Sequence, residues 1–114
     1  MSSSEATIQT YTGTVNREFL EAVDLVAIVS FLNGARTFWH KHPGGQVICV
    51  VDGLGWFQYE HEEKRELRPG DIVRVRRNEK HWHGAQAGRS LSYMVATSGE
   101  TEWFEEVQDS DDRR

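Results

Sequence analysis

Apolar and polar residues alternate along most of this chain with a period of two, as in β-strands that bury one face. β-Branched and aromatic residues dominate these segments, and turns containing glycine separate them. We expect strands over residues 23–31, 36–42, 46–51, 55–60, 65–67, 72–76 and 89–97. The expected turns are Asn33-Gly34, Pro43-Gly44-Gly45, Asp52-Gly53 and Arg68-Pro69-Gly70-Asp71, with a hairpin tip at 61–64. Residues 102–107 fit either a helical turn or a strand. Short strands at this spacing predict a small antiparallel sandwich or barrel.

Length and composition limit the classes of protein to which this chain can belong. The 114 residues suit one domain, expected over residues 7–107, with a flexible polar N-terminus at 1–6 and a flexible charged tail at 108–114. A mean hydropathy of −0.61 and the absence of a long apolar run argue against a membrane span, and the N-terminus does not resemble a secretory signal. The net charge of −5 argues against nucleic-acid binding. We therefore expect a cytoplasmic protein with neither membrane nor nucleic acid as a partner.

A basic run late in the chain does not change this expectation. Its members are Arg74, Arg76, Arg77 and Lys80. On a strand, Arg74 and Arg76 face away from Val73 and Val75 and therefore outward, where acidic residues of the 61–64 tip can pair with them. We interpret the run as a solvated outer face.

Four of the five histidines fall in two closely spaced pairs. His40 and His42 share one face of their predicted strand, and Gln46 keeps that parity if the intervening bend preserves the register. His81 must come from another strand, which a closed barrel places opposite. Three imidazoles and one amide oxygen suit a divalent transition metal with open coordination positions. For any one histidine alone, a hydrogen-bonded structural role is the alternative. The fifth, His61, is expected to be exposed.

The same residues resemble the two sequence motifs of the cupin superfamily. The positions of the first motif are occupied by Gly34, His40, His42, Gln46 and Gly53, with glutamine where most cupins carry glutamate. The second motif begins at Gly70 and reaches its histidine at His81, with Arg76, Asn78 and the closing Ala85 replacing the usual proline, glycine and asparagine. The resemblance covers about residues 25–97. It implies an all-β jelly-roll barrel, the double-stranded β-helix, with a metal held by His40, His42, Gln46 and His81.

A narrower resemblance points to one group of cupins. The segments 34–46 and 79–85, together with Tyr11-Thr12-Gly13-Thr14-Val15, are similar to small bacterial cupins that include manganese-dependent hydroxynitrile lyases. In that group a glutamine is a metal ligand, as Gln46 would be here. The resemblance implies that His83 lies beside the open coordination position and that the hydroxyl of Thr37 lines the pocket. Those lyases carry a further histidine where this chain has Tyr93.

These residues favour Lewis-acid chemistry. A carboxamide ligand leaves the full charge of a divalent ion uncompensated, so a bound hydroxyl should be more acidic and a higher oxidation state of iron less accessible. The resemblance implies manganese or iron, with zinc or nickel expected in recombinant material. A neutral His83 can exchange a proton near pH 7; its alternatives are a residue that orients a ligand, or a fifth ligand. For Thr37 the alternative is a simple strand residue.

We therefore expect a metal-dependent lyase that cleaves or forms cyanohydrins from a small-molecule substrate. The alternatives are an iron-dependent cupin dioxygenase and a non-enzymatic cupin that binds a metal or small ligand. Pocket-lining positions are expected at Ala27, Val29, Tyr93 and Thr97. Trp39 and Trp82 flank the ligands with opposite parity, so we expect a covering element or a partner subunit to bury them, and we expect a homodimer.

Overall fold

The computed structural model describes residues 11–19 and 26–108, so the N-terminus at 1–6 and all but the first residue of the 108–114 tail lie outside the described residues. The strands are β1 (Tyr11–Phe19), β2 (Val26–Thr37), β3 (His40–Lys41), β4 (Gln46–Gly53), β5 (Gly55–Tyr59), β6 (Arg65–Leu67), β7 (Ile72–Val75), β8 (His81–Ala85), β9 (Leu91–Thr97) and β10 (Glu102–Trp103). No helix occurs in the described ranges, and hence none there that is long and apolar enough to cross a membrane.

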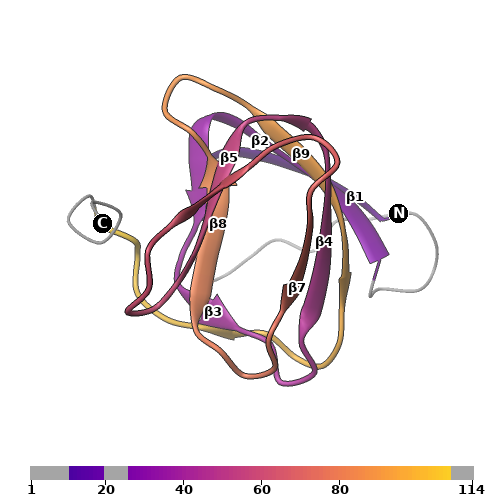
Figure 1. The fold of residues 1–114 in the computed structure, drawn as a ribbon, viewed down its shortest axis with the longest axis vertical. Helices are drawn as coiled ribbons and strands as arrows, with labels where there is room; N and C mark the ends of the chain where they lie inside the picture. Colours follow the sequence, from indigo (N-terminus) through magenta and orange to yellow (C-terminus); the bar gives the residue numbers. More distant parts are fainter. Residues whose placement is uncertain (1–10, 20–25, 109–114) are drawn as a thin grey trace.

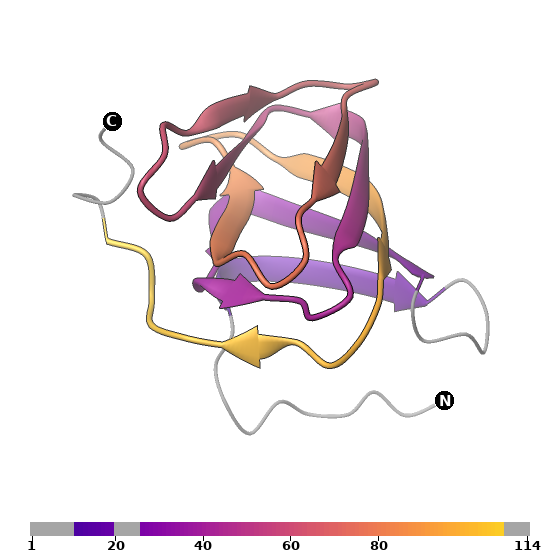
Figure 2. The same cartoon turned by 60° about the horizontal axis from the view of Figure 1, so that its bottom comes forward.

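All strand pairs are antiparallel and belong to one curled sheet. The main path runs β10-β3-β8-β2-β9-β4-β7; β1 extends it beside β2, and β5 pairs with both β6 and β8. The sheet curls into a barrel, which is seen end-on in Figure 1 and from below in Figure 2. This confirms the predicted all-β barrel. The hairpin tip at 61–64 and the turn before Ile72 also lie where the sequence predicts them.

The predicted turn at Asn33-Gly34 is wrong, because β2 continues through it. Both residues have positive φ, 54° and 77°, which is typical of turns. Here they form an irregularity opposite Gly13, where the pairing jumps from Thr12↔Arg36 to Thr14↔Leu32. The bend lets β2 change neighbours, from β9 as far as Phe31 to β8 at Arg36. One long strand therefore joins both walls of the barrel.

Apolar side chains that point inward from the strands pack together inside the barrel. The most completely buried are Phe31, Ile48, Phe57, Leu67, Leu91 and Tyr93. Val73 and Val75 point inward from β7, whereas the neighbouring Ile72 is 63% exposed. The predicted alternation on this strand is thus confirmed, and the strand is one residue shorter than predicted.

A second apolar cluster lies outside the barrel, where the predicted covering element proves to be the chain itself. Trp82 is fully buried and Trp39 nearly so, together with Val107 and, in part, Phe104. Residues 98–107, here called the C-terminal segment, run past β3 (Figure 2) and pair with it through β10. The guanidinium of Arg36 donates to the carbonyl of Val107 at 3.0 Å. The tryptophans therefore need no partner subunit to bury them.

Candidate metal centre

Strand pairing brings three histidines together inside the barrel. His40 lies on β3 and faces His81 on β8 as a register pair, while His83 follows two residues along the same face of β8. One ring nitrogen from each of the three lies within 4.8 Å of the others, and all three side chains are buried. The barrel therefore contains a buried three-histidine site able to bind a metal ion.

The other two predicted ligands lie beside this triad. The ring of His42 is 4.9 Å from that of His40 and 5.1 Å from that of His81, measured between centroids. Gln46, the first residue of β4, is buried and lines the same cavity. The bend at 43–45 thus keeps Gln46 on the inner side. The structure brings all four predicted ligands together. It also brings the ring of His83 to 5.1 Å from that of His40, measured between centroids.

Each of the three imidazole rings predicted to bind the metal makes a hydrogen bond through Nδ1. The carbonyl of Phe38 lies 2.8 Å from His40 Nδ1, and that of Glu79 lies 2.8 Å from His81 Nδ1. A carbonyl can only accept, so both rings carry their proton on Nδ1 and present a bare Nε2. The hydroxyl of Thr101 lies 3.0 Å from His42 Nδ1. Such support fixes the ring of a metal-binding histidine and raises its basicity.

Three of the four predicted ligands, and His83 beside them, each present a buried polar atom without a protein partner among the described residues. His42 Nε2, His81 Nε2, His83 Nε2 and Gln46 Oε1 are buried and have no hydrogen-bond partner in the described part of the chain. An unpaired buried polar group costs about 1–3 kcal/mol, so four such atoms around one point would be expensive without a ligand. Imidazole nitrogens with an amide oxygen form a donor set that suits a divalent transition metal. The residues present fit a metal centre.

Burial keeps these imidazoles neutral. It lowers the pKa of His42 to about 4 and that of His81 to about 3, and it lowers the pKa of His40 and His83 well below 6.5. Mutual repulsion between the rings acts in the same direction on His40, His81 and His83. At neutral pH the lone pairs are therefore available without prior loss of a proton, as metal binding requires.

An apolar cavity of about 290 Å³ opens beside the histidines. The predicted pocket residues Ala27, Val29, Tyr93 and Thr97 all line it, as do Thr37 and His83. Phe31, Val95 and Trp103 supply much of the remaining apolar wall. His61, in contrast, lies at the hairpin tip with its side chain 85% exposed. The cavity thus has one polar end, formed by the imidazoles, and an otherwise mainly apolar wall.

Hydrogen bonds place His83 firmly at that polar end. The phenol oxygen of Tyr93 lies 2.7 Å from His83 Nδ1, and the ring of Phe57 stacks parallel to the imidazole. The hydroxyl of Thr37 accepts the backbone N–H of His83 at 3.2 Å. Thr37 therefore both lines the cavity and ties β2 to β8 at the histidine.

The C-terminal segment supplies two site residues that the sequence did not predict. Thr101 bonds to His42, and the ring of Trp103 lies 4.6 Å from that of His40 and lines the cavity. Thr97, just before this segment, accepts a hydrogen bond from Gln46 Nε2 at 2.9 Å, which leaves Gln46 Oε1 facing the site. The only signal for the segment was a pair of aromatic residues, Trp103 and Phe104, in an acidic stretch.

Replacing Thr101 with valine should weaken metal binding by about tenfold or more, because His42 loses the group that fixes its ring. Titration of the metal-free protein with Mn²⁺ would measure this. Thr101→Ser keeps the hydroxyl and should bind Mn²⁺ as the parent does. Equal affinity of the valine and serine variants would show that this bond does not support the site.

Comparisons with known proteins agree with this geometry. Residues 27–97 match the family model described as the cupin domain. The chain is 38% identical over 113 residues to an (R)-mandelonitrile lyase of Granulicella tundricola, in an alignment covering 91% of this chain and 86% of that protein. A cupin-like protein from Thermotoga maritima superposes with a TM-score of 0.86 at 34% identity, covering 91% and 86% of the two chains. A cupin superfamily protein from Desulfitobacterium hafniense, at 22% identity and a TM-score of 0.62 over 74% and 77%, shares the fold. The chain belongs to the cupin family.

Proposed function

We propose that this protein is a metal-dependent hydroxynitrile lyase, which cleaves a cyanohydrin to a carbonyl compound and hydrogen cyanide or catalyses the reverse reaction. The observation that carries the proposal is the set of unpaired imidazole nitrogens at the end of an apolar cavity. The similarity to an (R)-mandelonitrile lyase at 38% identity supports this reaction among those that such a site can catalyse.

His40, His42, Gln46 and His81 would hold a divalent ion, which we propose is manganese. When bound, the ion would act as a Lewis acid toward the substrate oxygen. A neutral donor set leaves its charge uncompensated, which favours this chemistry over oxygen activation.

In this proposal His83 transfers the proton between the cyanohydrin hydroxyl and cyanide. Cleavage breaks the C–C bond, leaves its electron pair on cyanide and converts the hydroxyl to a carbonyl group, so the hydroxyl proton must be taken up and cyanide must be protonated. His83 Nε2 is unpaired at the cavity end, while Tyr93 and Thr37 fix the ring and its backbone. Burial lowers the pKa of His83 well below 6.5, so its free form is a proton acceptor at neutral pH.

The cavity wall indicates the substrate class. A volume of about 290 Å³ with apolar residues such as Val29, Phe31 and Val95 suits a small aromatic or aliphatic group, and the histidines offer polar contacts for the hydroxyl and nitrile. We propose small apolar cyanohydrins, with mandelonitrile as the compound to test.

The direct test is release of cyanide from mandelonitrile by manganese-loaded protein, compared with the same protein after chelation. The proposal expects turnover that is lost on chelation and restored by Mn²⁺. Substrate-dependent oxygen consumption by the iron form, without cyanide release, would support a dioxygenase instead. If no divalent metal gives turnover and mandelonitrile does not change thermal stability, the proposal is wrong.

We also propose that the protein forms a homodimer through the outer face of β4, β7 and β9. Val51, Ile72 and Met94 are large apolar side chains exposed on this face, and Ile72 and Met94 flank Cys49 in adjacent register. Burying such a patch against a second copy would remove apolar surface from water. Light scattering should give a dimer for the parent and a monomer for Ile72→Lys combined with Met94→Lys. A parent monomer at micromolar concentration would overturn this proposal.

A further inference from the structure

We propose that Arg76 is a positioning residue of the metal centre, which holds the turn that orients two of its ligands. Arg76 lies just after β7, at one of the positions where the sequence departs from the cupin motif. It does not touch the cavity. Its effect would pass through residues 76–79, here called the ligand turn, to His42 and His81.

The ligand turn makes direct hydrogen bonds to both histidines. The backbone N–H of Asn78 donates to the carbonyl of His42 at 2.8 Å, and the carbonyl of Glu79 accepts from His81 Nδ1 at 2.8 Å. Asn78 has a φ of 61°, a conformation that asparagine tolerates better than most residues but that glycine adopts more freely. A shift of this turn would therefore move the backbone of one ligand and release the ring of the other.

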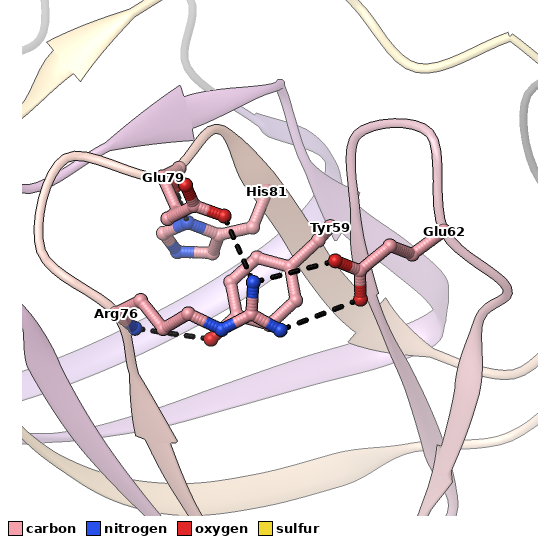
Figure 3. Close-up of polar contacts among 5 residues, drawn as sticks. All are labelled: Tyr59, Glu62, Arg76, Glu79 and His81. Carbon is pink, nitrogen blue, oxygen red and sulfur yellow. Dashed lines mark hydrogen bonds and ion pairs between the residues drawn. The ribbon is translucent and has the colours of Figure 1, made fainter.

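Arg76 fastens the ligand turn through its side chain and its backbone (Figure 3). Its guanidinium pairs with Glu79 at 3.0 Å, within the turn, and with Glu62 at 3.3 Å, on the hairpin tip. The guanidinium also lies 4.0 Å from the centre of the Tyr59 ring, while its backbone N–H donates to the Tyr59 hydroxyl at 3.0 Å.

Tyr59 connects this cluster back to the metal centre. It is buried on β5 and faces His81 on β8 as a register pair. The ligand turn is thus held at Tyr59 and at Glu62, on two neighbouring parts of the β5–β6 hairpin. Both anchors lie outside the turn, so they limit how far Glu79 and its carbonyl can move relative to His81.

A single exposed ion pair would not have this effect, because such pairs contribute little and are screened by salt. Arg76 differs from such a pair because its planar guanidinium contacts two carboxylates and an aromatic ring at the same time. Lysine cannot reproduce this geometry. Here the sequence has neither the proline nor the glycine that the motif usually places in this turn. Side-chain contacts from Arg76 take over the restraint that those residues would give through the backbone.

The inference rests on the metal centre of the proposed function but not on cyanohydrin chemistry, so its test uses Co²⁺ as the probe. Affinity would be measured by competition with a chromophoric chelator, and ligand geometry by the visible absorption bands of the Co²⁺ form. The variants are Arg76→Met, Arg76→Lys and Glu79→Gln, the last of which keeps the backbone carbonyl that binds His81. Arg68→Met is the matched control, because Arg68 is exposed and paired with Glu66 outside the metal centre.

We expect Arg76→Met to lower Co²⁺ affinity by about tenfold or more and to shift the absorption bands. Arg76→Lys and Glu79→Gln should lose part of this affinity, and Arg68→Met none. The thermal midpoint of the metal-free protein should change by similar small amounts in Arg76→Lys, Glu79→Gln and Arg68→Met, which separates positioning from general stability.

Co²⁺ affinity and bands like those of the parent in Arg76→Met would overturn the inference. If that variant does not fold, unchanged affinity in both Arg76→Lys and Glu79→Gln would overturn it equally. Failure of the metal centre itself gives a different result, because Co²⁺ would then bind no better to the parent than to His81→Ala.

Discussion

Replacing His83 with alanine is expected to slow cyanide release from mandelonitrile by about 10²–10⁴-fold, the usual contribution of a positioned acid–base group. The reason is that His83 lines the cavity, has an unpaired ring nitrogen and is not assigned to holding the metal. The bound metal should remain, since His40, His42, Gln46 and His81 are unchanged. The measurement is the turnover rate of manganese-loaded protein, together with its metal content.

Metal content distinguishes the possible roles of His83, because its ring nitrogen also belongs to the triad within 4.8 Å. Loss of activity with metal retained supports proton transfer. Joint loss of both would show that His83 is a ligand and would contradict the assignment made here, as would full activity in the alanine variant. His61→Ala serves as the control, because that ring is exposed on the hairpin tip.

Acidification should unfold the metal-free protein through its buried histidines. Burial lowers the pKa of His42 to about 4 and that of His81 to about 3, whereas the unfolded chain binds these protons near pH 6.5. The unfolded state therefore takes up more protons below pH 6.5. The stability that depends on neutral imidazoles is complete above that pH and is lost as the pH falls toward 4.

Each such histidine removes about 1 kcal/mol of unfolding free energy per pH unit in this window, so His42 and His81 together remove about 2 kcal/mol between pH 6 and pH 5. That is a large part of a typical unfolding free energy of about 5–15 kcal/mol. Chemical denaturation of the metal-free protein at several pH values would measure the slope. His42→Asn should reduce it and His61→Ala should not. A free energy of unfolding that stays constant from pH 7 to pH 5 would contradict the buried, neutral state of the cluster.

The histidine site was predictable because strand periodicity is a local property. Parity alone placed His40 and His42 on one face, and a bend of three residues returned Gln46 to the same side. The position of His81 opposite His40 was expected from closure of the barrel rather than from local pattern, and the two residues form a register pair. What remained open was the position of His83, because residues two apart share a face but their distances to a third strand depend on the twist of the sheet.

Two other features could not be predicted from local pattern. Asn33-Gly34 has the composition of a turn, but tertiary pairing of Leu32 and Arg36 with β1 carries the strand through it. The C-terminal segment forms a strand of only two residues, too short to show a period, and its position depends on packing against Trp39 and Trp82. The packing of this segment is what brings Thr101 and Trp103 to the site.

The most direct measurement is the elemental composition of protein grown with ample manganese, iron and zinc. We predict one divalent ion per chain in the parent and in His61→Ala, loss of the ion in His81→Ala and reduced occupancy in Gln46→Ala. A parent protein without bound metal, or a His81→Ala variant that retains it undiminished, would contradict the metal centre and the chemistry proposed for it.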